Sequence, residues 1–250
     1  MEIIGPYITN FIFILLRAGI VMSLLPFFGS KNVPAQFKIG AVAAFALVLT
    51  PVIHIPVESA DIPLVVLREL IMGITLGLLA RFVFLAVDVA GQVIGNAMGL
   101  SLATVFNPEI GQSTELAQTY GVITMLIFLS MDAHHDLIAL FVKSYEWVPA
   151  GSISIRNVAA EVISATGLIF IMAVKISAPV VIAMLISSLL LGFLYKAAPQ
   201  MNIFFIGYPV YLFVGFMVML MSMPVMIPVI GNYFSVMKDE MAKIIALAGG

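Results

Sequence analysis

The chain has 250 residues, of which 62% are hydrophobic and only 10% are charged, so it holds far more apolar residues than the core of one soluble domain can bury. The net charge of −2 gives no basis for a polyanionic partner, and the lack of a basic patch with interleaved aromatic residues argues against nucleic-acid binding. The absence of cysteine excludes disulfides, thiolate catalysis and cysteine-ligated metals.

Long apolar runs predict an all-α polytopic membrane protein with about six long helices, because a spanning helix needs about 20 apolar residues. In chain order, the runs are 8–28, 37–55, 64–102, 120–131, 162–195 and 201–237. A single helix from Leu64 to Leu100 would be about 55 Å long, whereas the hydrocarbon core is about 30 Å thick. Either this helix breaks, or part of it leaves the bilayer and packs on protein. Pro179 offers a kink in the fifth run.

The segment 132–161 is the most polar part of the chain and predicts a solvated connection with a short amphipathic helix. It contains His134 and His135, followed by Asp136. Neighbouring residues of a helix point about 100° apart, so adjacent histidines rarely bind one ion. Solvated histidines are therefore favoured here over a metal site or a proton relay.

Glycines recur every four residues in the third apolar run, a spacing that lets two helices approach closely. The predicted helix-packing residues are Gly73, Gly77, Gly91, Gly95 and Gly99. The alternative is that these glycines reflect the ordinary composition of membrane helices. The spacing does not say which helix lies opposite.

Charged residues inside apolar runs are costly and usually face protein or water. The predicted intramembrane charges are Arg17, Arg68, Glu69, Arg81, Asp88 and Lys175. They form either a polar pathway or subunit contacts, or they are neutralised locally, for example Glu69 by Arg68 or Arg81. A proton relay is disfavoured because the acids are few and scattered.

The stretch 98–109, MGLSLATVFNPE, leaves a glycine-rich helix, stays apolar and then breaks at Asn107 and Pro108. Irregular backbone is tolerated at membrane depth only where it is buried in protein or lines a cavity. This loop is therefore predicted to lie in a pore or an interface, with a plain helix end and surface turn as the alternative.

Several sequence blocks, in the same order along nearly the whole chain, resemble the FliR family of flagellar export-gate proteins, called SctT in injectisomes. The blocks are an N-terminal helix with Arg17, then PFFGSKNVP at 26–34 with Lys38, Arg68–Glu69 with Gly73 and Gly77, GQ at 91–92 with MGLSLATVFNP at 98–108, and APQMNIFFIGYP at 198–209. The blocks at 91–108 and 199–209 are the specific ones. The first of these is closer to flagellar than to injectisome members.

The resemblance implies a single membrane domain, 1–250, within a helical multi-subunit export gate. Residues 1–160 would form a FliP-like part with a pore-plugging loop near 99–112, and 161–250 a FliQ-like helical hairpin with a C-terminal tail. The plug residues carried over are Met98, Leu100, Leu102, Val105, Phe106, Asn107 and Pro108. The hairpin turn would contain Pro199, Gln200 and Asn202.

The resemblance also implies a function and partners. The chain would form and plug the pore through which unfolded flagellar proteins cross the bacterial inner membrane, in the flagellar basal body. Its partners would be several FliP-like and FliQ-like subunits, with a FlhB-like protein at the cytoplasmic mouth.

Two other classes of function remain open. A small polytopic secondary transporter predicts internal repeats and paired broken helices, and the halves of this chain show no convincing repeat. An intramembrane enzyme would need a catalytic constellation, but no G-x-S-x-G, H-E-x-x-H or phosphate-binding glycine loop is present. The sequence therefore predicts a protein that is not an enzyme and uses no cofactor.

Overall fold

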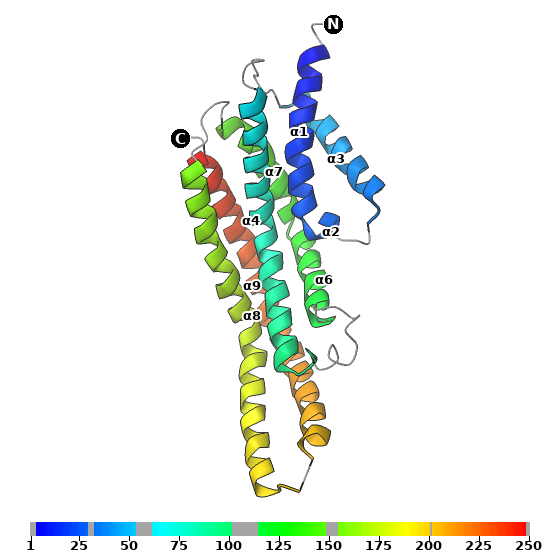
Figure 1. The fold of residues 1–250 in the computed structure, drawn as a ribbon, viewed down its shortest axis with the longest axis vertical. Coiled ribbons are helices and arrows are strands. Elements are labelled where there is room, and N and C mark those ends of the chain that lie inside the picture. Colours follow the sequence, from blue (N-terminus) through cyan, green and yellow to red (C-terminus); the bar gives the residue numbers. More distant parts are fainter. Residues whose placement is uncertain are drawn as a thin grey trace. The chain divides into compact units, whose positions relative to one another are not determined.

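The computed structural model of the chain describes residues 4–29, 33–53, 62–101, 115–148, 155–200 and 202–248. The regular structure in these ranges is entirely helical, as Figure 1 shows, and the all-α prediction is confirmed. The helices are α1 (Ile4–Leu24), α2 (Pro26–Gly29), α3 (Ala35–Leu49), α4 (Ile62–Ala97), α6 (Glu115–Ser130), α7 (Ala133–Trp147), α8 (Ile155–Ala197) and α9 (Ile203–Ala248).

Four of the described helices are long and apolar enough to cross a bilayer: α1, α4, α8 and α9. Helices α6 and α7 add a fifth candidate if this bent pair is one broken span. The prediction of about six long helices was therefore wrong. The second apolar run forms only the 15-residue α3, which at about 22 Å is too short to span a hydrocarbon core of about 30 Å.

The long helices exceed the thickness of a bilayer. Helix α4 has 36 residues, α8 has 43 and α9 has 46, which correspond to about 54, 64 and 69 Å. Each is one continuous helix, although α8 contains Pro179 and α9 contains Pro209, Pro224 and Pro228. The third apolar run was expected either to break or to continue as one helix that leaves the bilayer in part. In the structure it forms one unbroken helix, α4.

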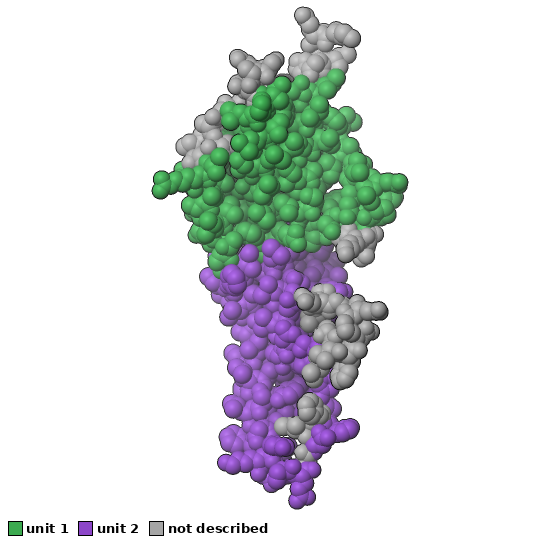
Figure 2. Space-filling model, in the orientation of Figure 1, with its two compact units in different colours: residues 1–82, 132–167, 235–250 green, residues 83–131, 168–234 purple. Residues whose placement is uncertain are grey.

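The chain divides into two compact units, coloured separately in Figure 2. Unit 1 consists of Met1–Phe82, Asp132–Gly167 and Ser235–Gly250, and here α1 packs against α2 and α3. Unit 2 consists of Val83–Met131 and Leu168–Phe234. Its core includes three aromatic rings from α4, α6 and α9, whose centroids lie 5.3 to 5.6 Å apart. They belong to Phe84, Phe128 and Phe234.

Helices α8 and α9 contact each other within each unit. Within unit 2, the Lys175 ammonium lies 5.6 Å from the centroid of the Tyr233 ring. Within unit 1, Lys243 near the end of α9 forms an ion pair with Glu161 near the start of α8. The chain reverses between the two helices, where the predicted turn residues Pro199, Gln200 and Asn202 are all exposed.

Candidate functional site: a buried charge network and the base of an apolar loop

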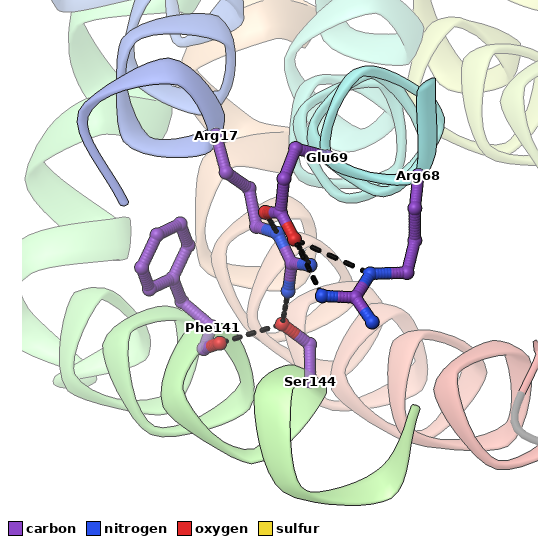
Figure 3. Close-up of polar contacts among 5 residues, drawn as sticks. All are labelled: Arg17, Arg68, Glu69, Phe141 and Ser144. Carbon is purple, nitrogen blue, oxygen red and sulfur yellow. Dashed lines mark hydrogen bonds and ion pairs between the residues drawn. The ribbon is translucent and has the colours of Figure 1, made fainter. Parts of the chain in front are cut away.

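Glu69 of α4 binds two arginines in the interior of unit 1 (Figure 3). Arg17 of α1 donates from Nε to Glu69 Oε2 at 2.6 Å and from Nη2 to Oε1 at 2.8 Å. Arg68 donates to the same Oε1 from Nη2 at 3.1 Å and from Nε at 3.4 Å. Arg17 and Glu69 have no exposed surface and Arg68 is 6% exposed, so both guanidinium groups depend on this one carboxylate.

Two glycines explain how α1 and α4 come close enough for this contact. A Cβ at Gly73 would lie 3.1 Å from the Cβ of Ile20, and a Cβ at Gly77 would lie 3.2 Å from the Cα of Val21. Glu69, Gly73 and Gly77 follow each other at intervals of one helical turn, so they share a face of α4. The close approach along this face places the short Glu69 side chain against the α1 arginine.

Helix α7 completes the network from the other side of Arg17. The Ser144 hydroxyl accepts a hydrogen bond from Arg17 Nη1 at 2.6 Å and donates to the Phe141 carbonyl oxygen at 2.6 Å, as Figure 3 shows. The Tyr145 ring lies 3.7 Å from the Arg17 guanidinium carbon, a cation–π contact. All three nitrogens of Arg17 therefore have partners. We call Arg17, Arg68, Glu69 and Ser144 the arginine–glutamate network.

The other three predicted charges lie outside this network. Arg81 and Lys175 are exposed on α4 and α8. Asp88 is half-buried and accepts a hydrogen bond from Gln92 Nε2 at 2.9 Å. The sequence offered two partners for Glu69. The structure pairs it with Arg68 and does not pair it with Arg81. The structure adds Arg17, which lies 52 positions away.

The second glycine series lies in unit 2, where α4 approaches α6. A Cβ at Gly91 would lie 2.5 Å from the Cα of Ala117, so the two backbones are in close contact. Gly95 is buried on the same helix. Gly99 has a φ of +79°, a left-handed conformation that favours glycine.

Gly99 caps the end of α4. The amide of Leu100 donates to the Gly95 carbonyl at 2.9 Å and that of Gly99 to the Asn96 carbonyl at 3.1 Å, the hydrogen-bond pattern of a Schellman motif. Met98 is fully buried, and its side chain fills the space that a Cβ at Gly215 of α9 would occupy, with contacts of 2.6 to 2.7 Å. Met98, Gly99 and Leu100 form what we call the loop base.

Of the predicted plug, the described residues include only the loop base and Ser101. Met98 is buried and Leu100 is half-buried. The remaining predicted plug residues, Leu102, Val105, Phe106, Asn107 and Pro108, lie outside the described residues.

The sequence analysis missed Ser144, Tyr145 and Gly215. Ser144 lies 127 positions from Arg17, and nothing in its local sequence marks it as an arginine partner. Gly215 stands alone in a methionine-rich run with no partner at four-residue spacing. Only the tertiary fold brings these residues to the positions that the sequence did identify.

Chemically, the arginine–glutamate network suits the positioning of helices. The Glu69 carboxylate accepts four hydrogen bonds from two guanidinium groups, so both of its oxygens are already engaged by side chains of the protein itself. The fold and this site together define a polytopic helical membrane protein whose buried charges hold three helices in register.

Comparison with known proteins assigns the family. The sequence profile of "Bacterial export proteins, family 1" matches residues 8–237. The chain is 31% identical over 248 residues to the flagellar biosynthetic protein FliR of Bacillus subtilis (strain 168), covering 96% of this chain and 95% of the relative. It is 32% identical over 237 residues to FliR of Escherichia coli (strain K12), covering 93% and 91%. FliR of Aquifex aeolicus (strain VF5) is 29% identical over 214 residues, covering 84% and 83%.

The chain therefore belongs to the FliR family of bacterial export proteins. The family resemblance in the sequence blocks is confirmed. Membership in a family of export-apparatus components also supports the expectation that the chain is not an enzyme.

Proposed function

We propose that this chain is a subunit of the type III protein export gate of the bacterial flagellum. In this role it forms part of the pore through which unfolded flagellar proteins cross the inner membrane, within the basal body. The observation that carries the proposal is the family match, which extends over residues 8–237 and so includes both glycine series and the predicted plug.

The proposed partners are FliP-like and FliQ-like subunits, with a FlhB-like protein at the cytoplasmic mouth. In this assembly residues 1–160 would take a FliP-like position and 161–250, with the hairpin of α8 and α9, a FliQ-like one. Large apolar side chains are exposed along this hairpin, including Leu189 and Phe193 on α8 and Phe213 and Met221 on α9. Side chains of this kind need lipid or neighbouring subunits to cover them.

The proposed plug is the segment 99–112, with Phe106 as its bulkiest side chain. A pore for unfolded chains has to admit varied side chains and still hold back ions, and an apolar constriction that excludes water does both. Methionine is unbranched and adapts to changing neighbours, and this chain has 16. The loop base supports the proposal, because the Gly99 cap and the buried Met98 fix the point from which the loop leaves α4.

The plug is tested by replacing Phe106, Asn107 and Pro108 together with glycine in cells that carry the whole gate. We expect faster entry of a small impermeant solute, with the chain still present in the complex. The matched control replaces Phe37, an exposed residue of α3, with glycine and leaves permeability unchanged. An unchanged ion conductance in the triple variant would overturn the plug.

The assembly is tested separately by native mass spectrometry after mild-detergent purification from cells that co-express the FliP-like and FliQ-like subunits. We expect one heavy complex that contains a single copy of this chain. A lone monomer or a homodimer without those subunits would contradict the export-gate proposal. That result would favour the alternative of a secondary transporter, which uptake assays in vesicles would then test.

A further inference from the structure

Three metal-binding side chains gather at the start of α7, away from the arginine–glutamate network. Asp132, His134 and His135 each offer one ligand atom, and these atoms lie within 4.8 Å of one another. The side chains of Asp132 and His135 are 71% and 68% exposed, so an ion can reach them from solvent. We infer that this His–His–Asp cluster binds a divalent transition-metal ion.

The backbone at Asp132 brings the three side chains together. Asp132 has a φ of 54°, in the left-handed region, and is the only non-glycine residue among those described with a positive φ. Its carboxylate returns over the first turn of α7, where Oδ1 lies 3.5 Å from His135 Nδ1. The two imidazole rings have centroids 4.1 Å apart. The sequence argued against chelation because neighbours on a helix point about 100° apart. In the structure the two rings nevertheless lie close together, and Asp132, just before the helix, brings a third ligand atom within 4.8 Å of theirs.

The donor set specifies the class of ion. Two imidazole nitrogens and one carboxylate oxygen suit Zn²⁺, Ni²⁺ and Cu²⁺, and three protein ligands with solvent in the remaining position are a common zinc arrangement. Magnesium and calcium prefer oxygen ligands, which this cluster offers from one residue only. The carboxylate of Asp132 also offsets the unfavourable effect of the α7 N-terminus on a cation.

The neighbouring acid is already engaged. Asp136, one turn further along α7, pairs with Lys238 of α9 at 2.7 Å. The cluster therefore has three protein ligands. A bound ion would join the residue before α7 to its first turn, and so stabilise the start of the helix that carries Ser144 at its other end.

The inference is tested on the full chain, purified in detergent with a tag that lacks histidine and stripped with a chelator. Isothermal titration calorimetry with Zn²⁺ is expected to give one site per chain. His135→Asn and Asp132→Asn are each expected to weaken binding by tenfold or more. Asparagine tolerates the left-handed conformation of Asp132, so the second variant keeps the backbone.

The matched control is His54→Asn, which removes the only histidine outside the cluster and is expected to leave Zn²⁺ affinity unchanged. The visible absorption of bound Co²⁺ gives a second readout, and its loss in His135→Asn but not in His54→Asn would support the cluster. The inference fails if the wild-type chain binds no Zn²⁺ at one-to-one stoichiometry, if both cluster variants bind as tightly as wild type, or if His54→Asn removes the site. None of these outcomes depends on export activity.

Discussion

Replacing Glu69 with glutamine is expected to destabilise unit 1 severely. The carboxylate is the counterion of both Arg17 and Arg68, which are 0% and 6% exposed. Glutamine keeps one acceptor oxygen but turns an NH₂ group toward a guanidinium, and it leaves both buried charges uncompensated. Removing one partner of a buried ion pair costs about 3–5 kcal/mol, which lowers the ratio of folded to unfolded protein by a hundredfold or more at about 1.4 kcal/mol per tenfold.

The measurement is the unfolding transition in mixed detergent micelles, followed by the fluorescence of Trp147, the only tryptophan. The matched control is Asp88→Asn, which removes a half-buried carboxylate of the same helix that is bonded to Gln92, and is expected to cost about 1 kcal/mol. The double variant Arg17→Gln with Glu69→Gln should lose less than the sum of the two single losses, because the residues are in contact. The reasoning is refuted if Glu69→Gln costs no more than Asp88→Asn, or if the losses add.

Glycine substitutions test the close approaches of α4. Gly91→Ala places a Cβ 2.5 Å from an α6 backbone atom and should cost about 3 kcal/mol. The control Gly121→Ala, in open space on α6, should stabilise by about 0.5 kcal/mol, and equal unfolding midpoints for the two variants would contradict this reasoning. Gly77→Ala should cost about 1–3 kcal/mol in the same assay, whereas the control Gly40→Ala, in open space on α3, should stabilise by about 0.5 kcal/mol. Equal midpoints would show that α1 does not need the space at Gly77. Gly99→Ala, at a φ of +79°, should cost about 1 kcal/mol and raise solute leak through the gate. Permeability equal to that of the wild type would show that the loop base does not affect the plug.

The glycine spacing predicted that α4 makes a close helix contact but not which helix it contacts. A series at every fourth residue predicted a close helix contact, and Gly73 and Gly77 do lie against another helix. The partner, α1, could not be predicted, because its contact surface consists of ordinary apolar side chains that would suit any membrane helix. A small-residue pattern specifies the distance of approach and says nothing of the opposite surface.

For the charged residues, too, the sequence did not identify the main partner. Their positions in apolar runs left open a polar pathway, subunit contacts or local neutralisation, and the main partner of Glu69 proved to be Arg17, 52 positions away. Local proximity favoured Arg68 and Arg81, but Arg81 lies about three helical turns after Glu69 and on an exposed face of α4. The count of spanning helices was wrong for a related reason, since composition could not distinguish α3, a short helix, from a span.

The length of α8 raises a different question, which the positions of its lysines answer. Lys175 is exposed in the middle of a helix of 43 residues, and a charge at the centre of the bilayer is costly. Between Lys175 and Lys196 lie 20 uncharged residues, 176–195, which span about 30 Å, the thickness of the hydrocarbon core. Lysines at the two ends of this segment can extend their ammonium groups to the lipid–water interface. We expect 176–195 to be the part of α8 in the bilayer and the part before Lys175 to lie outside it.

Single cysteines test this expectation without background, because the chain has none of its own. Ile163 and Leu189 are 71% and 66% exposed, so the chain itself covers them about equally. In intact membranes a water-soluble maleimide should label Ile163→Cys and spare Leu189→Cys, and both should react once the protein is unfolded in detergent. Repeating the labelling without partner subunits separates protection by protein from protection by lipid, because only the first is lost with the partners. If Leu189→Cys reacts in intact membranes lacking the partners, lipid does not cover 176–195, and the interface lysines would need another explanation.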